Sequence, residues 1–253
     1  MRLLTLILII NTLLIKLSYS DEIKSPLPKG ELFSQYESLK LQSNTGSVSA
    51  QYKLFMLFFQ NQQLLKSRSK ESLYYLEMAA SSQYIDAEFM LGALYQTGTL
   101  VGGKDFDKAK KLISRSAQRG NVDAQLMLAN NYALRFSRAS KLSDKKNYFS
   151  KAESWYLKVV LQGSTQAKRL YGLLLLRRSN KSNKGIQLLN EAAVEGDGSA
   201  MHSLGRHAEH LWAKQHVQKD YHLAIYWYKK AIAAGYSKAK KNMEILIEKG
   251  NKS

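Results

Sequence analysis

The sequence predicts an all-α protein, an α-solenoid of about five helix–turn–helix repeats. Three observations predict this class. Pairs of small residues recur 15 positions apart, a glycine falls at a fixed place between most of them, and no proline occurs after Pro28. Proline disrupts helix interiors, so a long proline-free body favours helices throughout. A fixed spacing that repeats along the chain is typical of stacked helix pairs.

Residues 1–20 have the layout of a secretory signal peptide. A short basic start precedes a mainly apolar stretch from Leu3 to Leu17, and small residues lead up to Ser20. We therefore expect cleavage at about Ser20–Asp21 and a periplasmic, exported protein. An uncleaved membrane anchor is the alternative, although the apolar stretch is shorter than the roughly 18–20 residues that a span requires.

Two short segments are expected between the signal peptide and the repeats. Residues 21–30 hold both prolines, Pro26 and Pro28, and predict an extended linker. Residues 31–49 predict an N-terminal capping helix or half repeat, because Gly46 stands where a repeat-ending glycine would stand.

The 15-residue step predicts how each repeat ends and the next begins. Apolar residues three, four, seven and eight positions after the first small residue form one helical stripe. A glycine then supplies the left-handed residue that ends a helix, except that Gln83 takes its place once. The five steps run from Ser72 to Ala87, Ala109 to Ala124, Ala152 to Ala167, Gly185 to Ala200 and Ala224 to Ala239.

A second small residue lies five positions into most of the helices that these alanines open. In the second to fifth repeats this residue is Gly92, Ala129, Gly172 and Gly205, in that order, whereas the first repeat has Phe55 at the same position. Small residues there predict close crossings of helices. The predicted repeats are 50–86, 87–123, 124–166, 167–199 and 200–238, within a repeat region 50–237, and residues 238–253 are predicted to form a C-terminal capping helix.

The second repeat carries a more specific pattern. The residues that make up this pattern are Ala87, Leu91, Gly92, Tyr95, Gly98, Val101, Asp105, Lys108, Ala109 and Gly120. On these residues the segment 87–120 resembles a Sel1-like repeat, a relative of the tetratricopeptide repeat. The resemblance extends over residues 50–250 and implies a curved superhelix with a concave groove lined by the first helix of each repeat. It also implies that groove-facing residues lie two, six, nine and ten positions after each opening alanine.

These groove positions change in character along the chain, from apolar and amide residues to cationic ones. Aromatic and arginine side chains often dominate binding energies at interfaces. Packing between repeats is the alternative role for the apolar members. The candidate partner-binding residues are Tyr52, Phe89, Asn130, Arg169, Arg177, His202, Arg206, Glu209 and His210.

The charge of the chain indicates what kind of partner it attracts. The formal net charge is +18, which favours acidic proteins or anionic lipid headgroups as partners. Because export is expected, we predict no nucleic acid partner. The connection 135–151 combines cations with Phe136 and Tyr148 and is a candidate for weak contact with an anionic lipid surface or an acidic partner; a merely solvated loop is the alternative.

The histidines raise the question of a metal site. All five lie between His202 and His222, and His207 and His210 are three positions apart, with Glu209 or His216 as a third ligand for zinc. The spacing matches no familiar site. We therefore predict no metal and no cofactor, and retain His207 and His210 as weak candidates.

Catalysis finds little support in the sequence. There is no cysteine and no nucleophile-elbow, phosphate-loop or HExxH signature. We predict a non-enzymatic module that binds another protein with an acidic surface, a toxin, an effector or an envelope protein. The resemblance implies an immunity or adaptor role that neutralises a secreted bacterial toxin such as a lipase. A general cell-envelope scaffold and an enzyme acting on the cell wall or on β-lactams are the alternatives.

Overall fold

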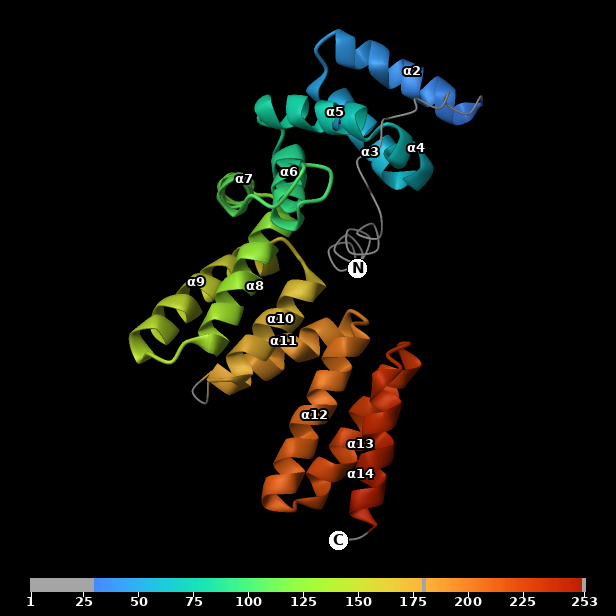
Figure 1. The fold of residues 1–253 in the computed structure, drawn as a ribbon. Coiled ribbons are helices and arrows are strands. Elements are labelled where there is room, and N and C mark those ends of the chain that lie inside the picture. Colours follow the sequence, from blue (N-terminus) through green and yellow to red (C-terminus); the bar gives the residue numbers. More distant parts are fainter. Residues whose placement is uncertain (1–29, 179–180, 252–253) are drawn as a thin grey trace. The chain divides into compact units, whose positions relative to one another are not determined.

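The computed structural model describes residues 30–178 and 181–251 (Figure 1). Within these ranges the chain is all-α, with thirteen helices and no strand. The predicted signal peptide 1–20 and all but the last residue of the linker 21–30 lie outside the described residues. Across the part that is described, no helix has the length and apolar character of a membrane span. The helices are α2 (Glu31–Asn44), α3 (Val48–Gln60), α4 (Gln62–Ser67), α5 (Ser69–Ser81), α6 (Ile85–Thr97), α7 (Phe106–Gln118), α8 (Val122–Arg138), α9 (Leu142–Leu161), α10 (Thr165–Leu176), α11 (Ser182–Val194), α12 (Gly198–Gln215), α13 (Gln218–Ala233) and α14 (Lys238–Gly250).

The opening alanines fix where the first helix of each repeat begins. Helices α3, α6, α8, α10 and α12 each begin two residues before the predicted alanine, and all five alanines are fully buried. In four of them the preceding polar residue caps the helix by accepting a hydrogen bond from the alanine amide. The caps are Ser47 to Ala50, Asn121 to Ala124, Ser164 to Ala167 and Asp197 to Ala200.

The turns ahead of these helices adopt the left-handed conformation that the spacing predicts. The glycines at 46, 120, 163, 196 and 235 all have positive φ between 81° and 104°. Gln83 holds the same place with φ at 59°, a conformation that costs a residue with a side chain about 1 kcal/mol or more. The first repeat therefore ends in a strained turn because it lacks this glycine.

Close helix crossings occur where the small residues predict them. A Cβ added to Gly172 would lie 2.8 Å from the carbonyl oxygen of Gly185, and one added to Gly205 would lie 2.7 Å from the ring of Tyr228. A Cβ on Gly92 would lie 2.8 Å from the side chain of Ile113. These distances leave no room for a side chain, so the glycines set how closely the two helices of a repeat approach.

The chain divides into two compact units within α8: unit 1 ends at Leu128 and unit 2 begins at Ala129. The core of unit 1 is rich in aromatic residues, with Tyr36, Phe55, Phe58 and Tyr75 buried together. Unit 1 also buries the carboxylate of Glu88 completely. The N-terminal helix α2 packs on this core through Tyr36, whose hydroxyl donates to Glu71 at 2.6 Å.

Unit 2 has a core cluster in its last part, where four alanines pack with Trp212, Tyr228 and Leu246. The prediction of a long connection over residues 135–151 was wrong, because α8 continues to Arg138 and α9 starts at Leu142. Only three residues of this segment lie outside helices. Buried Phe136 and Phe149, with ring centroids 5.6 Å apart, join the two helices into a hairpin.

Candidate protein-binding site

Helices α12 and α14 lie at the C-terminal end of the stack, and each occupies the position of the first helix of a repeat. Asp197 caps α12, which then presents one side through Arg206, Glu209 and His210. Helix α14 begins one residue before Ala239, the last alanine of the 15-residue series, and Ala239 is fully buried like the opening alanines. The helix within the predicted C-terminal cap therefore occupies the place of the first helix of a sixth repeat.

A depression of about 560 Å³ lies between these two helices. We call it the C-terminal groove. Its rim is charged, and Ile245, 40 % exposed, supplies an apolar surface within it. It is lined by Arg206, Glu209, His210 and Ala213 from α12 and by Asn242, Ile245 and Lys249 from α14.

The carboxylate of Glu209 is held by two partners inside this groove. The Tyr228 hydroxyl donates to its Oε2 at 2.6 Å, and the Lys249 ammonium lies 3.5 Å from its Oε1. Burial, together with the bond to Glu209, raises the pKa of Tyr228 above its ordinary value, so this hydroxyl remains a donor. The negative charge of the groove is thus already compensated.

The cations of the rim are placed differently. Arg206 and His210 are exposed, and Arg206 forms no ion pair with any described residue. His202 lies deeper: its ring is 5.0 Å from that of Tyr236, and its Nε2 is 2.9 Å from Asn242. Burial, and then the nearby charge of Arg206, lowers the pKa of His202, which favours a neutral ring. Arg206 is therefore an exposed cation of the groove that no described carboxylate neutralises, whereas Lys249 is paired with Glu209.

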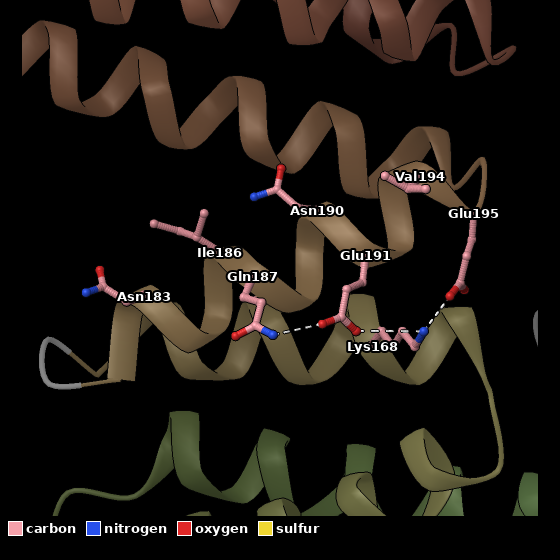
Figure 2. A pocket seen from close by; sticks show the side chains of 8 residues that line it. All are labelled: Lys168, Asn183, Ile186, Gln187, Asn190, Glu191, Val194 and Glu195. Atoms are coloured by element: carbon pink, nitrogen blue, oxygen red, sulfur yellow. Dashed lines mark hydrogen bonds and ion pairs between the residues drawn. The ribbon is translucent and has the colours of Figure 1, made fainter.

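Two other depressions lie elsewhere. One, of about 640 Å³, is formed in unit 1 by the turns 82–86 and 119–123 with Val48. The other, of about 870 Å³, covers an open face of α11 (Figure 2). In it Lys168 reaches from α10 to Glu191 and Glu195, and its hydrogen bond to Glu195 raises the pKa of Lys168. A single ammonium group thus pairs with both carboxylates of this face.

Residues 48–84, 85–121 and 198–236 each match the Sel1 repeat family. The chain contains three Sel1 repeats. The matched repeats begin with the first residue of α3, α6 and α12, so the family boundary falls at the helix start rather than at the alanine two positions later. Sel1-repeat proteins generally act as protein–protein interaction modules.

One solved structure shows the same fold. A Sel1 repeat protein from Oxalobacter formigenes is similar with 23% identity and a TM-score of 0.63, over 83% of each chain. A protective antigen present in uropathogenic Escherichia coli strains, displaying an SLR fold, is similar with 21% identity and a TM-score of 0.49, over 85% of this chain and 52% of its own. No curated protein matches the sequence.

The Sel1 repeats of unit 1 contain two of the predicted binding residues. Tyr52 is half-buried against Tyr84, with ring centroids 5.2 Å apart. Phe89 is only 4 % exposed, which corrects its prediction as a partner-binding residue: it packs within the repeats, the alternative left open for apolar positions.

Four of the predicted binding residues in unit 2 do not line the C-terminal groove. Asn130 accepts a hydrogen bond from Tyr156 at 2.6 Å. Arg169 is a further correction, because its guanidinium is bound to Asp197 at 2.9 Å and its side chain is 14% exposed, so it stabilises the start of α12. Arg177 is exposed at the end of α10, and His202 supports the groove from below the rim.

The groove thus brings together Arg206, Glu209 and His210 as the Sel1 geometry implies. Sequence reasoning missed Ile245 and Lys249, although a signal was present. They lie six and ten positions after Ala239, which are groove positions once α14 is counted as a first helix. No group of three potential metal ligands occurs among the described residues. Burial and then His210 lower the pKa of His207.

Proposed function

We propose that this protein binds an acidic, partly apolar segment of a partner protein in the C-terminal groove. The observation that carries the proposal is the exposed, unpaired guanidinium of Arg206 beside the exposed side chain of Ile245. A carboxylate of the partner can take up the charge of Arg206, and an apolar side chain can cover Ile245. Arginine at such a position is a frequent source of binding energy.

The state of Glu209 supports an acidic rather than a basic partner. Its carboxylate is occupied by Tyr228 and Lys249, so it offers little attraction to an incoming cation. The surrounding unit is strongly basic, which raises the rate of encounter with an acidic segment. Such steering weakens with salt, since surface charges are screened beyond about 10 Å at 0.1 M ionic strength.

The test uses fluorescent acidic peptides that contain leucine, with basic peptides of the same length for comparison. Anisotropy should show binding of the acidic peptides only, and Arg206→Glu should weaken it by at least about tenfold because attraction becomes repulsion. Ile245→Asp should weaken it as well.

The matched control is Lys229→Glu, which makes the same charge change at an exposed position of α13. It should leave peptide binding within about twofold of the parent. Equal losses in Arg206→Glu and Lys229→Glu would mean that net charge, rather than the groove, attracts the peptide.

For the setting and the partner we propose export and a secreted bacterial toxin such as a lipase. The pattern of residues 1–20 supports export, and the basic groove suits an acidic toxin surface. Cells that lack this protein should survive less well beside a toxin-delivering neighbour, and Arg206→Glu should reproduce that loss. Unchanged survival of both strains would argue against the immunity role.

A further inference from the structure

The free end of the α8–α9 hairpin is a second charged surface of unit 2, distinct from the C-terminal groove. We define the hairpin tip as residues 134–146, which form the last turn of α8, a three-residue link and the first turn of α9. Figure 1 shows α8 and α9 lying side by side and joined by this link. The tip carries five cations against the single acid Asp144: Arg135, Arg138, Lys141, Lys145 and Lys146.

These cations are available to a partner molecule because no acidic side chain of the described residues pairs with them. Among the described residues, none of the five forms an ion pair. Arg135 rests over the ring of Tyr148, 6.0 Å from its centroid. The other four have no such aromatic contact, and Arg138, Lys141 and Lys146 are exposed.

Two leucines lie among the charges. Leu134 is 46% exposed on the last turn of α8 and Leu142 is 66% exposed at the start of α9. Both are on the tip, so apolar and cationic groups reach the same end of the hairpin. Exposed leucine with lysine and arginine is the composition that lies in the boundary between lipid headgroups and acyl chains.

The hairpin holds this end firmly. Phe136, within the tip, and Phe149 of α9 are buried against each other, and Arg178 and Lys181 lie over the ring of Phe149 at 5.0 Å. The order of the tip therefore does not depend on a ligand. None of the three depressions described above includes a residue of 134–146.

We infer that the hairpin tip binds anionic phospholipid surfaces. A projecting turn offers a peptide no groove, whereas a flat, negatively charged headgroup layer can contact all five cations while the two leucines enter its apolar boundary. The acidic, partly apolar partner segment of the proposed function has a lined groove at the C-terminal site and none at the tip. The tip would thus hold the protein at a membrane surface with the C-terminal groove as its separate binding site.

The strength follows from the number of cations. Each lysine or arginine near an anionic membrane surface contributes about fivefold to binding. Reversing three of them should therefore weaken binding by about 100-fold or more.

The test is co-sedimentation of the full chain with vesicles of phosphatidylcholine alone or with about 30% phosphatidylglycerol, at about 0.05 and 0.5 M salt. The parent should bind the anionic vesicles at low salt and lose most of this binding at high salt. The triple variant Arg138→Glu, Lys141→Glu and Lys146→Glu should lose it at low salt. The matched control Lys219→Glu, Lys229→Glu and Lys230→Glu changes the net charge equally at exposed positions of α13 and should still bind.

A second variant separates insertion from general attraction. Leu142→Asp should weaken binding by about tenfold, with helix content by circular dichroism unchanged because the side chain is exposed. Parent binding that is equal on neutral and anionic vesicles, or equal losses in the tip and control triple variants, would overturn the inference.

The acidic-peptide assay keeps this proposal apart from the proposed function. The tip variant should bind the acidic peptide as the parent does, since Arg206 is intact. A tip variant that loses the peptide but keeps vesicle binding would assign the tip to a protein partner and overturn lipid binding.

Discussion

The two units use their arginines in opposite ways. In unit 1 all three arginines of residues 30–128 form ion pairs: Arg68 with Glu71, and both Arg115 and Arg119 with the buried Glu88. Among the six arginines of the described part of unit 2, only Arg169 does so, with Asp197. The arginines of unit 1 are therefore paired within the protein, whereas most of the described arginines of unit 2 are not.

The overall charge follows the same division. Residues 30–128 carry 11 Lys and Arg against 9 Asp and Glu, whereas residues 129–251 carry 22 against 9. Both proposed binding surfaces lie in the more basic unit. The repeat spacing constrains the buried stripe and leaves the exposed positions free, which allows one unit to specialise in charge without altering the fold.

The repeats also differ in how closely their two helices approach. At the fifth position after the opening alanine, the first repeat has Phe55, whereas Gly92 stands there in the second repeat of unit 1 and Gly172 and Gly205 in two repeats of unit 2. A large ring fills the space between helices in the first repeat, whereas at Gly172 the backbone of Gly185 closes it. Substitutions at this position should expose the difference.

The largest effect is expected from Phe55→Ala in unit 1. Phe55 is fully buried and lies 5.4 Å, ring to ring, from Phe59. Removing the ring should lower the free energy of unfolding by about 4 kcal/mol because it leaves a cavity. Urea denaturation would measure it, with Phe106→Ala, 64% exposed, as a control expected to change stability by less than about 0.5 kcal/mol. A loss below about 1 kcal/mol would show that the neighbouring helices close the gap.

The second effect is expected from Gly172→Val in unit 2. The new Cβ would meet the carbonyl oxygen of Gly185 at 2.8 Å, and backbone cannot move aside as a side chain can. We expect a loss of about 3 kcal/mol in the free energy of unfolding, together with faster amide hydrogen exchange in α10 and α11. Ala233→Val, at an exposed position of α13, is the control and should cost only about 0.5 kcal/mol. A variant as stable as the parent would refute the close-contact role of this glycine.

The smallest effect is expected from Gln83→Gly, a gain. It replaces the residue held at φ 59° by the one that suits this conformation. The free energy of unfolding should rise by about 0.5–1 kcal/mol, observable as a higher melting temperature. The reciprocal change, Gly120→Gln in the next turn, should lower stability by a similar amount. If both changes moved stability in the same direction, the turn geometry would not explain the recurring glycine.

Much of the fold could be predicted from spacing because helix pairs repeat a local pattern. The opening alanines, the glycine turns and the close crossings depend on residues a few positions apart or in the adjoining helix, which periodicity shows directly. The helical continuation through 135–151 was not foreseen because that polar, charged segment has a weaker apolar stripe. Its burial depends on the contact between Phe136 and Phe149.

The binding residues were harder to predict. The sequence placed Arg206, Glu209 and His210 on one face, but it could not show that Arg169 is bound by Asp197 or that Phe89 is enclosed. Ion pairs of this kind join different helices, and no helical period encodes which carboxylate comes within reach.

By itself, then, the sequence determined the spacing of the repeats, the left-handed turns and the excess of positive charge, since each depends on residue type and near neighbours. Only the tertiary structure decided which cations remain unpaired and where α14 meets α12 to form a groove. Those outcomes depend on the packing of helices far apart in the chain. A charge becomes a binding group only when that packing leaves it without a partner inside the protein.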